Sequence, residues 1–127
     1  GFSKTVEEWT EFKDVADIRK HFEDQWTDGM SWDNYGLGHG KWSIGHELPR
    51  AYFDGGKAKD IAACWMKVNL FPQWSVDNSK QSSKLPSPER LSILIDSGCC
   101  PGLFGGRVPS IEERARFEKL ASKGKLF

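Results

Sequence analysis

Four short stretches between residues 29 and 84 organise this chain. They read GMSWDNYG at 29–36, KWSIGHELPRAYF at 41–53, VNLFPQW at 68–74 and DNSKQSSK at 77–84. Aromatic residues occur in the first three, and the first two also contain glycine, as turns and short extended segments do. The fourth is polar and contains neither glycine nor proline, so it can form a helix. Both the fold and the functional interpretation depend on these stretches.

The elements expected from this region are short. Residues 42–44 and 47–53 predict two extended segments with aromatic content. Residues 57–66 have a helical composition, with apolar side chains on one side. Residues 69–72 are expected to form a loop, because the proline that ends them disfavours helix in the residue before it. Residues 75–84 can form the helix that follows.

Toward the N-terminus, one helix is clearly indicated. Residues 15–26 place four apolar side chains on one face, and Asp14 can cap the first turn. Gly29 is a natural stop beyond its end. A short amphipathic helix is also expected at residues 6–12, where apolar residues recur every three or four positions.

Two helices are expected after residue 85. Ser87 precedes residues 89–97, which predict a helix because serine is a favourable N-terminal cap. Ser110 and Glu113 have the spacing of a capping box, and they predict a charged helix at 111–122. The loop between the two helices is rich in glycine and proline.

Apolar residues in that loop are candidates for binding a partner. Leu103 and Phe104 lie within residues 99–109, which are expected at the surface. Large apolar side chains on a surface loop are typical of protein interfaces. The sequence therefore predicts a partner-binding site at these two residues.

Composition limits the classes of function. The chain has 127 residues, enough for one domain with a modest core, and 18 basic against 18 acidic residues. A dedicated nucleic-acid binder usually has a basic excess, so the balance argues against that class. Three cysteines without a framework spacing favour a reducing, intracellular compartment. There is no apolar run long enough to span a membrane, and no signal peptide is recognised.

The four stretches, in this order, resemble the phage and homing type of HNH endonuclease. Members of that family read GMtWeNYGkWHIDHIiPlsxF, then a helix, then NLQPLwaxxNxxKgnK, and the preceding helix here also resembles the family's eLrkHlEkqf segment. The similarity covers residues 15–84, more than half of the chain. It implies an α+β fold with a small ββα-metal core at about 42–84. Residues 1–85 would then form the HNH-like domain, and residues 86–127 a C-terminal helical extension.

The resemblance also implies a chemistry, metal-assisted hydrolysis of phosphodiester bonds. Carried over by position, His46 is the general base, Asn69 braces the loop that positions it, and Asn78 is a helix-borne metal ligand. The metal carboxylate of the family falls on Gly45, and its first histidine falls on Ser43. Mg²⁺ needs oxygen ligands and usually at least one carboxylate, so this pattern predicts a degenerate site.

Two acidic residues are the nearest substitutes for the missing carboxylate. Glu47 lies two residues beyond Gly45, which displaces it by about 6–7 Å along an extended strand. Asp77 is adjacent to Asn78 but projects about 100° away from it on a helix. Neither is well placed, so no cofactor is expected unless the site is active, when Mg²⁺ or another divalent ion is required.

Simpler interpretations exist for the same residues. His46 can be a structural histidine held by a hydrogen bond, and Asn69 and Asn78 can brace a loop and cap a helix without catalysis. His21 and His39 are expected to be exposed to solvent.

Three hypotheses of function follow. The first is a non-catalytic HNH-derived domain that serves as a structural or adaptor subunit of a larger assembly, bound to other protein subunits, with a mitochondrion or chloroplast as one setting. The second is an active, divergent HNH DNA endonuclease. The third is a module that binds DNA or RNA without cleaving it, through Arg50, Lys80 and Lys84. The first is favoured by the missing carboxylate, the balanced charge and the added C-terminal segment.

Overall fold

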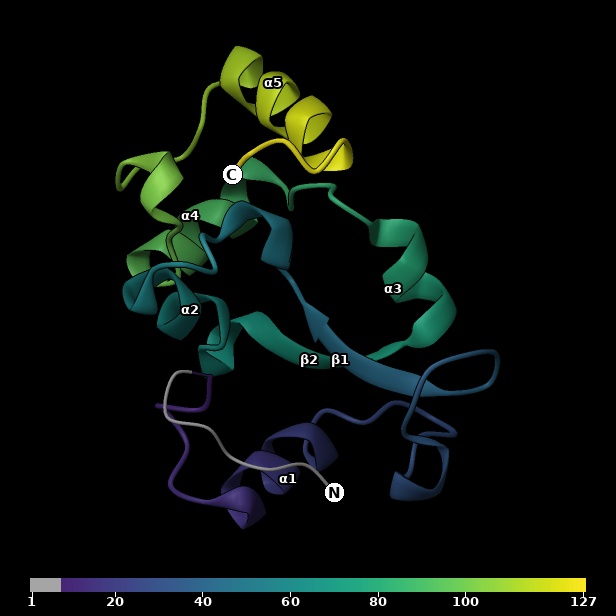
Figure 1. The fold of residues 1–127 in the computed structure, drawn as a ribbon. Helices are drawn as coiled ribbons and strands as arrows, with labels where there is room; N and C mark the ends of the chain where they lie inside the picture. The colour runs from purple at the N-terminus through teal and green to yellow at the C-terminus, as the bar shows by residue number, and fades with distance from the viewer. Residues whose placement is uncertain (1–7) are drawn as a thin grey trace.

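The computed structural model describes residues 8–127 and has a small α+β fold (Figure 1). Within these residues, five α-helices surround one two-stranded antiparallel hairpin. The α+β class expected from the sequence is confirmed. In chain order the elements are α1 (Val15–Glu23), β1 (Trp42–His46), α2 (Ala58–Cys64), β2 (Leu70–Trp74), α3 (Ser75–Gln81), α4 (Pro88–Asp96) and α5 (Ile111–Ser122).

The second strand of the hairpin is not the one expected. Residues 47–53 contain a short 3-10 helix at Arg50–Tyr52, and the partner of β1 is β2, which includes the predicted loop 69–72. Glu47 N–H donates to the carbonyl of Asn69 at 2.9 Å. Hydrogen-bonded pairs alternate along an antiparallel ladder, so Pro72 falls in a pair that exchanges no hydrogen bond. Its missing N–H therefore costs the ladder nothing, and the loop prediction was wrong for this reason.

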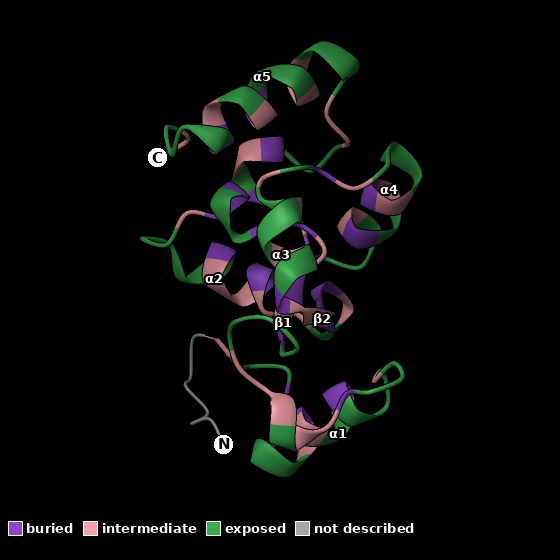
Figure 2. Cartoon of the chain, turned by 90° about the vertical axis from the view of Figure 1, so that its right-hand side faces the viewer, coloured by how far each residue is buried: buried purple, intermediate pink, exposed green. Residues whose placement is uncertain are grey.

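Helices cover both faces of the hairpin. Successive side chains of β1 point to opposite faces. Trp42 is fully buried on the α1 side, with its ring centroid 6.0 Å from that of Phe22. Ser43 faces α3, because its hydroxyl accepts a hydrogen bond from the Asn78 amide at 3.3 Å. Figure 1 shows α1 and α3 on different sides of the strands, and Figure 2 shows buried residues in the hairpin and also in α1, α2 and α4.

A second core joins the C-terminal helices to the rest of the chain. It contains Leu48 and Tyr52 from the segment after β1, Cys64 of α2, Leu94 of α4 and Phe117 of α5, all buried. The two expected C-terminal helices are therefore present, and they share a core with residues before position 85. A domain boundary at residue 85 stays a prediction.

A buried carboxylate adds a polar link between the two parts. Asp60 is 5% exposed, and its two oxygens accept hydrogen bonds from the N–H groups of Asp54 at 2.7 Å and Gly102 at 3.1 Å. Because a buried charge is costly unless it is hydrogen-bonded, this arrangement holds the loop after α4 against the start of α2.

Local signals located the helix starts correctly. Asp14, Ser87 and Ser110 each accept a hydrogen bond from a backbone N–H in the first turn of α1, α4 and α5. Helix α1 ends earlier than expected. No helix forms at residues 8–12, so the short helix expected at 6–12 is wrong for that part, and its first two residues lie outside the described residues.

The exposure expected for Phe104 is wrong. Its side chain is 4% exposed, and its ring stacks on that of Phe117 with centroids 5.7 Å apart. Leu103 is half-buried. The glycine and proline residues of this loop fold it back onto the second core, so exposure gives no support to a partner site at Leu103 and Phe104, and that role stays a prediction.

All three cysteines are free thiols, two of them buried. Among residues 8–127, no helix has the length and apolar character needed to cross a membrane.

Candidate functional site

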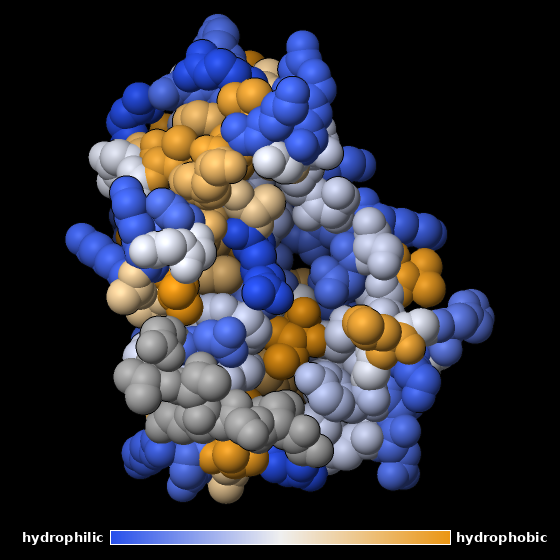
Figure 3. Space-filling view, in the orientation of Figure 1, coloured by the Kyte–Doolittle hydropathy of each residue, from blue (hydrophilic) through white to orange (hydrophobic). Residues whose placement is uncertain are grey.

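A cleft of about 470 Å³ lies beside the end of β1, between the hairpin, α3 and the segment after β1. It brings together two of the residues carried over from the HNH pattern, His46 and Asn78. Figure 3 shows the face of the molecule that is hollowed here. The lining residues are Ile44, His46, Pro49, Arg50, Ala51, Trp65, Asn78, Gln81, Ser82, Ser83 and Ala121.

His46 ends β1 and is 8% exposed. Its ring is perpendicular to that of Trp65, with centroids 4.7 Å apart, and its Nε2 has no hydrogen-bond partner. Burial, together with the positive charge of Arg50, lowers the pKa of His46 to about 3. The imidazole is therefore neutral near neutral pH. It is also a weak base, because efficient general bases have pKa values close to the working pH.

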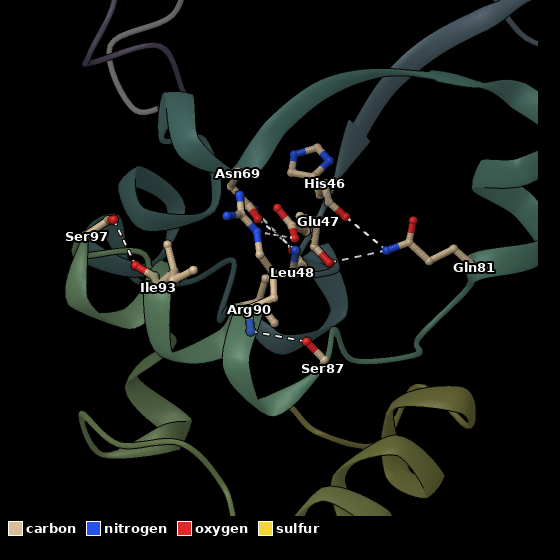
Figure 4. Close-up of polar contacts among 9 residues, drawn as sticks. All are labelled: His46, Glu47, Leu48, Asn69, Gln81, Ser87, Arg90, Ile93 and Ser97. Carbon is tan, nitrogen blue, oxygen red and sulfur yellow. Dashed lines mark hydrogen bonds and ion pairs between the residues drawn. The ribbon is translucent and has the colours of Figure 1, made fainter. Parts of the chain in front are cut away.

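Asn69 braces the turn that follows β1. It is fully buried, and its Oδ1 accepts a hydrogen bond from Leu48 N–H at 2.7 Å. Its Nδ2 donates to the carbonyl of Leu48 at 3.1 Å (Figure 4) and to that of Cys64 at 2.9 Å. One amide thus fixes the chain just beyond His46 to the end of α2. This is the geometry that a bracing residue requires, with or without catalysis.

The space beside Gly45 is already filled. A Cβ atom built on Gly45 would lie 2.5 Å from Oε1 and 2.8 Å from Cβ of Gln73, and 3.1 Å from Cζ of Phe71. Real side chains do not approach one another so closely, so at least one backbone would have to move. The position that the resemblance gives to the metal carboxylate has neither a side chain nor room for one.

The side-chain amides of Gln73 and Gln81 connect the space beside Gly45 to α3. The Nε2 of Gln73 donates to Oε1 of Gln81 at 2.8 Å. Gln81 in turn donates to the carbonyls of His46 and Glu47, both at 3.3 Å, as Figure 4 shows. These contacts link α3 to the end of β1 through protein groups alone.

The two acidic substitutes point elsewhere. Glu47 forms an ion pair with Arg90 of α4, at 2.5 Å between Oε2 and Nε. Asp77 is exposed and lines a separate hollow with Met30 and Trp74. Within residues 8–127, no three His, Cys, Asp or Glu side chains converge to hold a metal ion. The residues present do not fit a divalent cation.

The predicted nucleic-acid contacts are not gathered in one place. Arg50 lines the cleft, with its guanidinium carbon 5.3 Å from the centroid of the Trp65 ring. Lys80 and Lys84 are exposed but do not line the cleft.

Sequence reasoning missed Gln73, Gln81 and Trp65, which shape the site. The one available signal was Gly45 itself, since glycine within a strand often marks the close approach of another group. His39 is exposed, as expected. The expectation for His21 was wrong, because its Nε2 lies 2.9 Å from the carbonyl of Leu70 and the side chain is half-buried.

Comparison with protein-family models, with curated proteins and with solved structures gives no match. The HNH interpretation therefore depends on the quoted residues and on the geometry of this site.

Proposed function

We propose that this chain is a non-catalytic domain with an HNH-like ββα core that serves as a structural or adaptor subunit of a larger assembly. The observation that carries the proposal is the side chain of Gln73, which fills the space beside Gly45. An organellar assembly is one such setting, and the free cysteines suit a reducing compartment.

The arrangement of the elements supports descent from an HNH-like protein. A hairpin is followed directly by α3, a buried asparagine braces the loop between the strands, and His46 and Asn78 line one cleft. The HNH sequence pattern contains the same elements and residues in the same order.

The same site is unsuited to catalysis for two independent reasons. Mg²⁺ requires oxygen ligands and usually a carboxylate, and within residues 8–127 no three His, Cys, Asp or Glu side chains converge to supply such a set. The pKa of His46, lowered by burial, leaves little driving force for removing a proton from water. No hydrolytic step can therefore be derived for these residues.

Cleavage of supercoiled plasmid DNA in Mg²⁺ or Mn²⁺ tests this proposal. We expect no nicking above a protein-free control, and no difference between the wild-type chain and a His46→Ala variant. Divalent-dependent nicking that disappears in His46→Ala would overturn the proposal and favour the divergent-nuclease hypothesis.

A nucleic-acid-binding module is the second candidate, favoured by the position of Arg50 in a cleft without an acidic residue. If Arg50, Lys80 and Lys84 all contact phosphates, the logarithm of affinity should fall with the logarithm of salt concentration with a slope of about −2 to −3. Fluorescence anisotropy with labelled DNA and RNA measures this slope. A binding constant that does not respond to salt argues against the module.

A further inference from the structure

The outer edge of β1 carries a backbone residue without a partner. Ile44 is opposite Pro72 in a pair that exchanges no hydrogen bond, so its N–H and C=O point away from β2. The neighbouring outward carbonyls are occupied, that of Trp42 by Gly36 N–H at 2.8 Å and that of His46 by Gln81. Within residues 8–127, no hydrogen bond occupies the outward groups of Ile44. Ile44 therefore offers one N–H and one C=O to a main-chain contact from outside the hairpin.

A groove runs from this edge toward the C-terminal segment. The cleft of about 470 Å³ that Ile44 lines shares Ala51 and Ala121 with a second hollow of about 140 Å³. Leu126 and Phe127 line the second hollow, and the Phe127 side chain is 62% exposed. The groove is therefore polar beside the strand edge and apolar at its far end.

Arg50 gives the groove an unbalanced positive charge. No Asp or Glu is among the residues that line either hollow, and His46 is neutral. Three other arginines pair with glutamates: Arg90 at 2.5 Å, Arg107 at 2.8 Å and Arg114 at 3.8 Å. Arg50 forms no ion pair among the described residues and only faces the Trp65 ring. A concave site with one free guanidinium favours an anionic occupant.

We infer that this groove binds an extended, acidic segment of a partner protein that passes Ile44 of β1. Main-chain hydrogen bonds to Ile44 fix the segment, a carboxylate pairs with Arg50, and an apolar side chain packs on Leu126 and Phe127. The main-chain contact at Ile44 holds the backbone of the segment, and the charged and apolar parts of the groove give specificity. The inference rests on the proposed adaptor function and names the chemistry of the partner.

A polypeptide suits the groove better than a nucleic acid. Nucleic-acid affinity depends on many phosphate contacts, whereas this groove has one cation and an apolar end. The chain as a whole has no basic excess, with 18 basic and 18 acidic residues. The outward N–H and C=O of Ile44, by contrast, can pair with one residue of an extended peptide.

Selection of short random peptides displayed on phage, against the full chain, tests the inference. We expect enrichment of peptides with Asp or Glu next to apolar residues. The consensus peptide, synthesised with a fluorophore, should bind Arg50→Ala at least about tenfold more weakly than wild type. Arg116→Ala is the matched control, because that arginine also faces an aromatic ring, at 5.7 Å, but lies outside the groove. In amide NMR spectra the Ile44 resonance should shift on binding.

A second variant covers the case in which Arg50→Ala perturbs the fold. Ala51 is exposed, so Ala51→Glu should fold normally and repel the acidic peptide, whereas Ala51→Lys should bind it more tightly. The inference is overturned if no acidic consensus is enriched, if Arg50→Ala and Arg116→Ala bind equally, or if oligothymidylate displaces the peptide and binds more tightly. If acidic peptides bind through Arg50 and the chain also nicks DNA, the inference about the groove stands and the proposed function is wrong. If the chain neither nicks DNA nor enriches acidic peptides, the proposed function stands and the inference about the groove is wrong.

Discussion

Replacing Gly45 by aspartate returns a carboxylate to the position where the HNH pattern has one. The structure nevertheless predicts that Gly45→Asp alone forms no metal site. The new Cβ would lie 2.5 Å from the Gln73 amide oxygen, which can rotate away, and 2.8 Å from Gln73 Cβ, which is fixed by the backbone. Overpacking of this kind costs about 1–3 kcal/mol. Each kcal/mol lowers the melting temperature by about 4 °C in a domain of this size, so we expect a loss of about 4–12 °C.

Thermal unfolding followed by circular dichroism, with and without Mn²⁺, measures both effects. We expect Gly45→Asp to unfold at a lower temperature than wild type, with no recovery on addition of Mn²⁺. Removing the obstacle as well, in the Gly45→Asp, Gln73→Gly double variant, should restore part of the stability and allow Mn²⁺ to stabilise the fold. A metal at a hundred times its dissociation constant adds about 2.7 kcal/mol, which is readily measured. Gln73→Gly alone is the control and should not respond to the metal.

The steric reasoning is wrong if Gly45→Asp melts at the wild-type temperature and binds Mn²⁺ at micromolar concentration in calorimetry. That result would mean that the space beside Gly45 opens without cost. If the wild-type chain itself binds Mn²⁺ this tightly, the nuclease hypothesis replaces the one proposed above.

Further predictions concern the stability of the same region. Asn69→Ala leaves one buried N–H and two carbonyls without partners, and should cost at least about 3 kcal/mol in urea denaturation, while Asn69→Asp places a buried carboxylate against the same two carbonyls and should cost at least as much. Ser82 has φ +49°, so Ser82→Gly should raise the urea midpoint by the equivalent of about 1 kcal/mol. Hydrogen bonds from Arg107 and from Ser110 N–H lower the pKa of Glu113 from 4.5 to about 2, so stability from this group is present above pH 4.5 and lost as pH falls toward 2. Arg107→Gln should raise that pKa, as followed by NMR titration, and flatten this part of the pH profile. Dialysis against EDTA should leave the melting temperature unchanged.

The parts of the fold that sequence predicts are those determined locally. Asp14 and Ser87 mark helix starts because a capping side chain bonds within its own first turn. The position of β2 could not be found this way, because the tolerance for Pro72 depends on its register against β1. Phe104 likewise lies in a segment whose composition is typical of an exposed loop, and its packing against Phe117 of α5 and Tyr52 buries it. Register and packing between distant segments are not encoded in local composition.

The candidate site, like the fold, could be predicted from the sequence only in part. The sequence pattern located His46, Asn69 and Asn78, and two of these line one cleft while the third braces the turn beside it. The pattern also identified Gly45 as the departure from the family. It gave no sign that Gln73 occupies the empty space, since nothing in a glutamine distant in the chain indicates which strand it will face.

The end of β1 is held by three contacts that involve only protein groups. Asn69 fixes the turn beyond it, Gln81 bonds to its last carbonyl, and Glu47 pairs with Arg90 of α4. In a metal-dependent site, the ion would supply part of this linkage between strand and helix, and its loss would loosen both. Here side chains of the protein supply this linkage, so the end of β1 and the groove beside it can keep a fixed shape. A rigid groove lowers the entropy cost of binding, which is what an adaptor that captures an extended partner requires.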